Sequence, residues 1–424
     1  MAQAFGAACF RNTILETHAS GQGRRVPKQL AGSLIGAEAV RMRLCFVCSE
    51  YPPVPHGGLG TIAQVLGRAL VRGGHEVRVV GIYDDGASEP SFSRDEGVEV
   101  WRVRESAHRF GWLRARYRLF RMVAEWSRTN LIDLVEVPDW WGPAAGWSRL
   151  SVPVVARLNG SATFFGSELG RPVRRTVFSL EEASLRRADA WCASSSYTAE
   201  RSRQLFSLPS APSAILFNPI ELPSSTPAAP RSTHQIVFAG TLTAKKGVIS
   251  LIRAWPLVVL RHPDAELHLY GKDGQAASGD SMRAHLAGLL DAASRSRVYF
   301  HGHVGRDVLY RAFATARAGI FPSYAEAFGI APFEAMACGC PTIYTRRAPG
   351  PELLRDGMDG LLVDPDDPPA IAEAILRLLA DDNLAARLGE AGHRRVVDRF
   401  AIDTLLAENE AFFAQAIERF RAGA

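Results

Sequence analysis

The feature that most constrains this chain is a strand–helix alternation that begins near Arg43 and restarts once in the second half. Short β-rich runs such as "LCFVCS" and "HEVRVVGIY" are separated by helical stretches such as "GTIAQVLGRALVRGG". Such alternation is typical of parallel sheets, because helices join successive parallel strands and cover both faces. A chain of 424 residues is also too long for a single hydrophobic core. The sequence therefore predicts an α/β fold of two Rossmann-like parallel-sheet domains that face a central cleft.

The stretch "NPIELPSSTPAAPRSTH" separates the two rounds of alternation, because it is rich in Pro, Ser and Ala and has no periodicity. We place an N-terminal domain at 42–222, a linker at 223–234, a C-terminal domain at 235–398 and a final long helix within 399–424. Residues 1–41 have no sustained periodicity and no secretory signal pattern. We expect them to be a disordered extension or a mis-called start, with Met42 as the true first residue.

Net charge, the length of apolar runs and the cysteines limit the ligands, membrane topology and compartment that the chain can have. The formal net charge of +5 fits an anionic ligand or an anionic membrane surface. No apolar run reaches the ~18 residues that cross a bilayer. The six cysteines give no disulfide framework, and Cys45 and Cys48 lie in an expected buried strand. We expect a cytoplasmic protein with no nucleic-acid partner, since no nucleic-acid-binding motif is present.

Two glutamates flank a small apolar turn in "FPSYAEAFGIAPFEAMACGCP". Pro332 is tolerated only near a helix start, so the helix begins near Gly329 or Ile330. Glu326 then lies in the loop ahead of the helix, and Glu334 lies about one turn inside it. The backbone amides between them are unpaired at the positive end of the helix. Carboxylates beside such amides fit a ligand with hydroxyls and phosphate, and a nucleotide sugar has both.

A glycine loop follows the first expected strand in "PHGGLG", where Gly57, Gly58 and Gly60 open a helix. Without side chains these residues let backbone amides approach a ligand, and a helix N-terminus favours negative charge. The spacing does not match the GxGxxG fingerprint of nicotinamide dinucleotides. We predict that the three glycines bind the donor, with a tight strand–helix turn as the structural alternative.

Together these motifs resemble the retaining GT-B glycosyltransferases of family 4, from Arg43 to about Phe420. The resemblance also rests on "NGSATFF", "LFNPI", "FAGTLTAKKG", "YGKDG", "FHGHV" and "DGMDGLLVDPDD". It implies a hexosyltransferase that moves a sugar, with retention, from a nucleotide-diphosphate sugar to a hydroxyl of a glycan, a lipid-linked saccharide or a small molecule. It implies donor binding mainly in the second domain, acceptor binding mainly in the first, and a terminal helix that crosses back to the first domain.

The resemblance assigns roles to individual residues. Glu334 would accept hydrogen bonds from the ribose, Glu326 would contact the transferred sugar, and Lys246 would neutralise the diphosphate. The fold would need no metal and no cofactor besides the nucleotide sugar, because the lysine and the helix dipole stabilise the leaving group. The predicted catalytic residues are Glu326, Lys246 and Asn159. The other predicted donor contacts in the second domain are Gly240, Thr241, Lys245, Val304, Phe328, Gly329 and Ile330.

Two positions depart from the common family pattern. Thr241 stands where the family usually has Arg, and Lys245 is the candidate replacement for that charge. Asn159 stands where a His is common, and an amide can position a hydroxyl but cannot carry a proton. These departures keep open a nucleotide-sugar-binding pseudo-glycosyltransferase. A GT-B-type UDP-GlcNAc epimerase is a further alternative.

The acceptor side offers two weaker signals. As a helix from Trp112, the basic segment "WLRARYRLFRMVAEWSR" has an arginine stripe opposite an apolar face that contains Leu113 and is broken by Arg116. This helix either lies on anionic lipid, giving peripheral contact at the inner membrane face, or packs its apolar side on the first sheet. In "VEVPDWWGPAAGW", Asp139 and Trp140 are predicted acceptor contacts, since tryptophan faces stack on sugar rings, with core tryptophans as the alternative.

Overall fold

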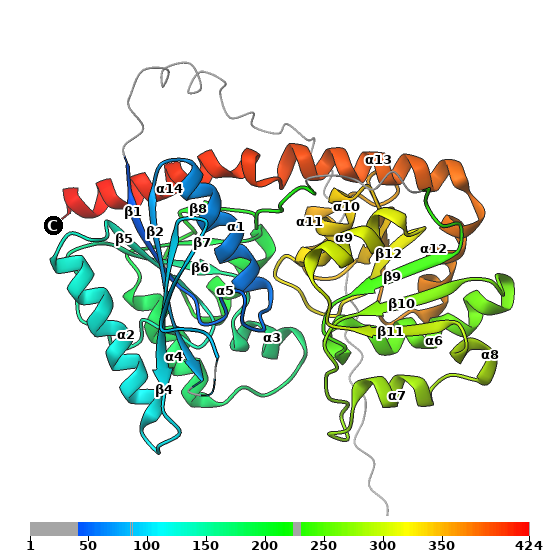
Figure 1. Cartoon of the computed structure of the whole chain (residues 1–424), viewed down its shortest axis with the longest axis horizontal. Helices are drawn as coiled ribbons and strands as arrows, with labels where there is room; N and C mark the ends of the chain where they lie inside the picture. Colours follow the sequence, from blue (N-terminus) through cyan, green and yellow to red (C-terminus); the bar gives the residue numbers. More distant parts are fainter. Residues whose placement is uncertain (1–40, 85, 87, 224–229, 424) are drawn as a thin grey trace, which may run out of the picture. The chain divides into compact units, whose positions relative to one another are not determined.

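The computed structural model describes residues 41–84, 86, 88–223 and 230–423, which form two α/β domains (Figure 1). Residues 1–40 and the linker residues 224–229 lie outside the described residues, so the predictions made for them are not addressed. No helix among the described residues combines the length and apolarity that a membrane span requires.

The first sheet has eight strands in the order β3-β4-β2-β1-β5-β6-β7-β8. Its strands are β1 Arg43–Val47, β2 Glu76–Asp84, β3 Phe92–Asp95, β4 Val98–Glu105, β5 Leu134–Pro138, β6 Val154–Leu158, β7 Ala190–Ala193 and β8 Ala214–Ile215. The helices of this domain are α1 Gly58–Arg72, α2 Gly111–Arg128, α3 Ala162–Glu168, α4 Arg175–Arg187 and α5 Ser196–Leu205. The β-rich runs "LCFVCS" and "HEVRVVGIY" form β1 and β2, as expected.

One strand was not predicted. β3 pairs antiparallel with β4 at the edge of the first sheet. Glu96 and Gly97 connect the two strands, with φ angles of 46° and 90°. Positive φ at both central residues is the geometry of a tight hairpin. The sequence Glu-Gly is not among the strong hairpin signals, so the pattern did not reveal this strand.

The second sheet has six parallel strands in the order β11-β10-β9-β12-β13-β14, as expected. Its strands are β9 Gln235–Ala239, β10 Glu266–Tyr270, β11 Val298–Gly302, β12 Ala318–Phe321, β13 Thr342–Thr345 and β14 Leu361–Val363. Its helices are the 3-10 helix Ala244–Lys246, α6 Val248–Arg261, α7 Met282–Gly288, α8 Ala292–Arg295, α9 Arg306–Thr315, α10 Ile330–Ala337, α11 Gly350–Leu353, α12 Pro368–Ala380 and α13 Asp382–Arg399. The prediction of two parallel-sheet domains is thereby confirmed.

Both faces of each sheet are buried. In β9, Ile236 and Phe238 enter a core with α6 and α12, whereas Val237 and Ala239 enter a core with α9, α10 and α13. Alternate residues of a strand point to opposite faces, so a strand covered on both sides must be apolar throughout. This explains the continuous apolar run "QIVFA".

The last helix, α14 Ile402–Ala422, completes the core of the first domain although it follows the second domain in sequence. Its Phe412, Phe413 and Ile417 pack with Phe46 of β1 and Leu70 of α1. The apolar face of α14 is therefore covered by the first domain (Figure 1).

The order of the strands fixes where a ligand site is expected. In the first sheet the direction of winding reverses between β1 and β5, and in the second between β9 and β12. Ligands of open parallel sheets bind beyond the carboxyl ends of the strands at such reversals. The segments that follow these four strands begin at Cys48, Asp139, Gly240 and Pro322, and they hold most of the predicted site.

Candidate active site

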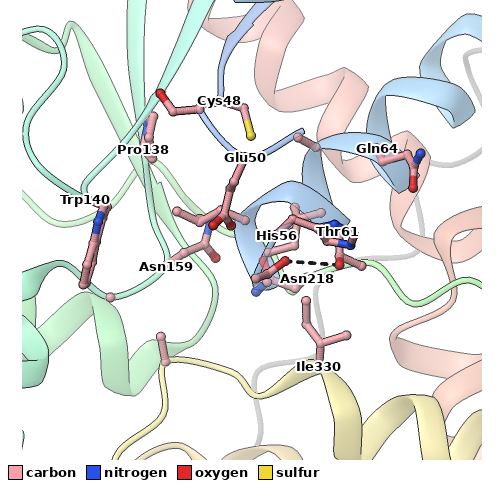
Figure 2. A pocket seen from close by; sticks show the side chains of 18 of the residues that line it. Cys48, Glu50, His56, Thr61, Gln64, Pro138, Trp140, Asn159, Asn218 and Ile330 are labelled. Atoms are coloured by element: carbon pink, nitrogen blue, oxygen red, sulfur yellow. Dashed lines mark hydrogen bonds between the residues drawn. The ribbon is translucent and has the colours of Figure 1, made fainter. Parts of the chain in front are cut away.

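A cavity of about 1130 Å³ is lined by residues from both domains. Small-molecule sites commonly occupy roughly 300–1,000 Å³, so this volume is enough for two substrates. All the predicted site residues except Gly60 and Asp139 line it. Figure 2 shows Glu50, Asn159 and Trp140 on the first-domain side of the cavity and Ile330 of α10 on the other side.

The turn between the two glutamates is fixed by tertiary contacts. Gly329 precedes α10 with a φ of 82°, and a Cβ atom there would lie 2.6 Å from the Tyr344 hydroxyl oxygen. That hydroxyl donates a hydrogen bond of 2.8 Å to the carbonyl of Phe328. Only glycine satisfies both the left-handed backbone and the close approach. The first amides of α10 are thus held at the cavity.

Glu326 and Lys246 form an ion pair inside the cavity. The Lys246 Nζ lies 2.7 Å from the Glu326 Oε1, and Glu326 is only 6% exposed. Burial by itself raises the pKa of Glu326, but the charges of Lys246 and Lys245 outweigh it and hold the pKa below its usual value. Glu326 is therefore ionised at neutral pH, and a carboxylate faces the ligand space.

Glu334 has a different environment. Its Oε1 lies 3.7 Å from the Nε of Arg306, whose own stronger partner is Glu221 at 2.6 Å. Burial raises the pKa of Glu334, and Arg306 offsets this only in part. A buried carboxylate with one distant cation retains acceptor capacity for a ligand hydroxyl.

Lys245 links the two walls of the cavity. Its ammonium group lies 3.7 Å from the centroid of the Phe165 ring of α3, at cation–π distance. Burial lowers the pKa of Lys245 to about 8, and the positive charge of Lys246 adds to that effect. Lys245 therefore becomes more firmly protonated when an anion enters beside it.

The glycine loop divides into two kinds of position. Gly57 and Gly58 line the cavity, at the N-terminus of α1. Gly60 does not line it, and its amide donates a hydrogen bond of 2.9 Å to Glu50 Oε1. A Cβ atom on Gly60 would lie 2.0 Å from the carbonyl oxygen of Glu50. Gly60 thus permits close backbone packing and anchors Glu50, and the structure gives it no direct place beside a ligand.

Asp139 also lies outside the cavity, although we had predicted an acceptor contact. Its carboxylate, 1% exposed, accepts hydrogen bonds from the amides of Asn159 at 3.1 Å and Gly160 at 3.0 Å. Glu181 binds the next amides in the same way, those of Ala162 at 2.9 Å and Thr163 at 3.0 Å. Two buried carboxylates therefore hold the loop that carries Asn159, so Asp139 positions this loop from behind.

Asn159 itself faces the ligand space. It lines the cavity, and its Oδ1 is a buried atom with no hydrogen-bond partner among the described residues. Buried polar atoms are rarely left unsatisfied, so an orphan acceptor in a cavity marks a position for a ligand donor. The amide is placed to accept a hydrogen bond from a hydroxyl group.

The turn at residues 140–143, called the tryptophan turn below, has a strained backbone that is held by hydrogen bonds. Trp141 has a φ of 61°, a conformation that bulky residues rarely adopt. Its amide donates to Glu181 Oε1 at 3.3 Å. Arg116 of α2 donates to the carbonyls of Gly142 at 2.6 Å and Pro143 at 3.1 Å. Trp140 and Trp141 remain 39% and 49% exposed and line the cavity, which contradicts the alternative of core tryptophans.

Helix α2 packs on the sheet through Leu119, Val123 and Trp126. Leu113 was expected on this apolar face, but it is 54% exposed. Arg116, which interrupts the apolar face in the sequence, points to the cavity. The break in the apolar pattern therefore marks a residue that lines the cavity.

Several cavity residues were missed from the sequence: Glu50, Glu105, Trp112, Arg116, Asn218, Lys272 and Arg306. Glu50 and Lys272 come soon after β1 and β10, and Arg306 opens the helix after β11. Their position beyond the carboxyl ends of strands was a usable signal.

Comparison with known families gives two matches. Residues 57–219 match the model described as "Glycosyl transferase 4-like domain", and residues 233–381 match "Glycosyl transferases group 1". Together the two models cover about three quarters of the chain.

Individual relatives agree over nearly the full length. A glycogen synthase of Mycobacterium tuberculosis is 28% identical over 86% of this chain and 92% of its own. A D-inositol 3-phosphate glycosyltransferase of Xylanimonas cellulosilytica is 28% identical over 86% of this chain and 93% of its own. The crystal structure of Anabaena HepE in complex with UDP and glucose superposes with a TM-score of 0.67, at 17% identity, over 88% of this chain and 100% of that one. The chain is therefore a glycosyltransferase, a hexosyltransferase of the GT-B fold, with a glycosyl transferase 4-like domain in its first half and a glycosyl transferases group 1 domain in its second.

Proposed function

We propose that the protein transfers a sugar from a nucleoside diphosphate sugar to a hydroxyl acceptor, with retention of anomeric configuration. The observation that carries the proposal is the Lys246–Glu326 pair of 2.7 Å beside the first amides of α10. A leaving diphosphate gains negative charge in the transition state, and a fixed cation with helix-end amides stabilises that charge. Glu326 is then next to the sugar that departs from the diphosphate. The bound UDP and glucose of the HepE structure support this choice of donor class.

The rest of the donor follows from the same geometry. Glu334, at the second turn of α10, accepts hydrogen bonds from ribose hydroxyls, and Arg306 holds its carboxylate in place. Lys245 and Lys272 line the same wall and supply further positive charge for the diphosphate. No cofactor is required in this proposal apart from the nucleotide sugar as co-substrate.

The test is a donor panel. Nucleoside diphosphate release is measured with UDP-, GDP- and ADP-sugars in the presence of a mixture of glycan, lipid-linked and small-molecule acceptors. We expect release and a new glycosidic product with one donor class, and NMR of the product should show the donor's anomeric configuration. Donor binding without any turnover would favour the pseudo-glycosyltransferase, and conversion of UDP-GlcNAc without an acceptor would favour the epimerase.

We also propose that α2 makes peripheral contact with an anionic membrane. Its outer side exposes Leu113 at 54% and Tyr117 at 61%, with Phe110 just before it at 56%. Arg114 and Arg118 are exposed between them. Aromatic and aliphatic side chains interleaved with arginines favour the headgroup region of anionic lipid. In vesicle co-sedimentation, phosphatidylglycerol should retain the protein and phosphatidylcholine should not; equal behaviour in both would rule out this contact.

A further inference from the structure

We propose that the acceptor is an uncharged, hydroxyl-rich saccharide and not a phosphorylated sugar or polyol. The inference rests on the proposed function and names the class of acceptor at the same site. The relatives do not decide this point, because the name of one is glycogen synthase and that of another is D-inositol 3-phosphate glycosyltransferase. The class of acceptor is inferred from the charged side chains that line the two walls of the cavity and from the hydrogen bonds and ion pairs that these side chains already form.

Acidic and basic groups divide unevenly between the two walls. The second-domain wall has a basic excess: Lys245, Lys246, Lys272 and Arg306 against Glu326 and Glu334. The first-domain wall has an acidic excess: Glu50, Glu105 and Glu136 against Arg116 and Arg157. Phosphate groups therefore meet a favourable field on the donor side and an unfavourable one on the acceptor side.

Both arginines of the first-domain wall are already engaged. Arg157 forms two hydrogen bonds of 2.9 Å with the carboxylate of Glu136 and one of 2.8 Å with the side-chain oxygen of Asn409. Arg116 donates to backbone carbonyls of the tryptophan turn and lies 4.9 Å from the Trp112 ring centroid. The Nη1 of Arg157 is buried without a hydrogen-bond partner among the described residues, but Nε and Nη2 are occupied. A phosphate would therefore have to break contacts with Glu136 or Asn409 to gain two guanidinium nitrogens of Arg157. The wall thus offers an anion no ready bidentate site.

Two carboxylates of that wall have no cationic partner. Within the part of the chain that the structure describes, no Lys, Arg or His nitrogen lies within 4.0 Å of Glu50 or Glu105, since neither forms an ion pair. Glu50 accepts a hydrogen bond from the Gly60 amide, and it lines the same cavity as Asn159 (Figure 2). Ionised carboxylates only accept hydrogen bonds. Together with the orphan Oδ1 of Asn159, this wall selects hydroxyl donors and repels phosphate.

The tryptophan turn adds the apolar part of a saccharide site. Trp140 and Trp141 line the cavity and keep exposed ring surface. Glu181 and Arg116 hold the strained backbone of Trp141 before any ligand enters. Aromatic faces stack on the C–H faces of sugar rings, and a preset surface loses little entropy on binding. Oxygens that accept hydrogen bonds from hydroxyl groups, together with exposed aromatic faces, are suited to bind an uncharged saccharide.

The test compares matched acceptors: glucose with glucose 6-phosphate, and myo-inositol with D-inositol 3-phosphate, alongside maltotriose. Calorimetric titration of the full chain measures binding without turnover, and product formation measures transfer with the donor from the panel. We expect an uncharged saccharide to bind, and the uncharged member of its pair to bind roughly tenfold or more tightly than the phosphorylated one. The double variant Glu50→Gln, Glu105→Gln should reduce that ratio. The control Glu182→Gln, a partly exposed residue paired with Arg186 on α4, should leave the ratio unchanged.

The outcomes separate the two proposals. Equal affinities within each pair, tighter binding of the phosphorylated members, or no binding of any uncharged saccharide overturns the inference. An unchanged ratio in the double variant, with a normal melting temperature, overturns the role of the two carboxylates. Failure of the proposed function appears differently, as absence of nucleoside diphosphate release with every donor, and leaves the calorimetric comparison intact.

Discussion

The buried carboxylate of Asp139 makes a prediction that needs no substrate. It is 1% exposed and accepts two backbone hydrogen bonds from the loop that carries Asn159. Burial raises the pKa of Asp139 to about 7 from 3.8, and the nearby charge of Glu181 contributes. The folded state therefore keeps a proton across a pH range in which the unfolded chain has released it. Stability must then fall as the pH rises through this range.

The magnitude follows from the two pKa values. With a folded pKa of about 7 and an unfolded pKa of 3.8, raising the pH from 5 to 7 removes about 2.3 kcal/mol of unfolding free energy. For a domain of this size, 1 kcal/mol shifts the melting temperature by about 2–4 °C. The contribution of Asp139 is thus about 5–9 °C. The asparagine of Asp139→Asn does not titrate, so the variant lacks this pH-dependent change in stability. It also loses one of the two backbone hydrogen bonds, at every pH.

The assay is a series of thermal melts of the wild type and Asp139→Asn at pH 5, 6, 7 and 8. The measured quantity is the melting temperature of the variant minus that of the wild type, so the effects of other groups cancel. We expect this difference to rise by about 5–9 °C between pH 5 and pH 7. The exposed Asp264→Asn serves as the control and should give a difference that does not depend on pH. A constant difference for Asp139→Asn would show that Asp139 is ionised throughout and that the burial argument is wrong.

Three further predictions concern the donor side. Glu326→Gln should lower the transfer rate by about 10²–10³ while the melting shift induced by nucleoside diphosphate persists, and an unchanged rate would remove Glu326 from the reacting centre. Glu334→Ala should raise the donor KM by about 10–100-fold, because the ribose hydroxyls lose the carboxylate to which they donate hydrogen bonds. A loss of kcat alone would contradict a ribose contact. Gly329→Ala should cost about 1–2 kcal/mol of stability, read from thermal melts, since an L-residue is strained at that φ of 82°; wild-type melting would show that the turn relaxes freely.

The sequence predicted most of the fold and many of the residues that line the cavity for one physical reason. Parallel strands covered on both faces are apolar runs, and the runs in this chain are short and separated by amphipathic helices. Residues that follow such runs, including Gly240, Lys246 and Glu326, are necessarily at the cleft edge of the sheet. Their position could therefore be predicted from the sequence, and the structure brings them to one cavity.

The residues that escaped prediction depend on contacts far apart in the sequence. Glu181 lies in the middle of α4 and binds the amide of Thr163, a contact that no local pattern encodes. Asp139 was predicted, because it follows a strand, but as an acceptor contact; its carboxylate instead accepts hydrogen bonds from the backbone of the loop after β6. Glu50 becomes distinctive only because Gly60 packs against it and no cation of the described residues forms an ion pair with it. Distance in sequence, and not weak local signal, was the obstacle.

The peptide next to Glu326 is held by both domains, and this explains why the two walls form one site. The carbonyl oxygen of Ala327 lies 2.9 Å from the hydroxyl oxygens of both Ser195 and Thr198, which belong to the first domain. A Cβ atom on Gly160, the neighbour of Asn159, would lie 3.1 Å from the Cβ of Ala327, so that loop touches the same residue. The loop that carries Glu326 is thus seated on the loop that carries Asn159. The contact between the domains therefore sets the position of Glu326 relative to Asn159, which neither sheet could fix alone.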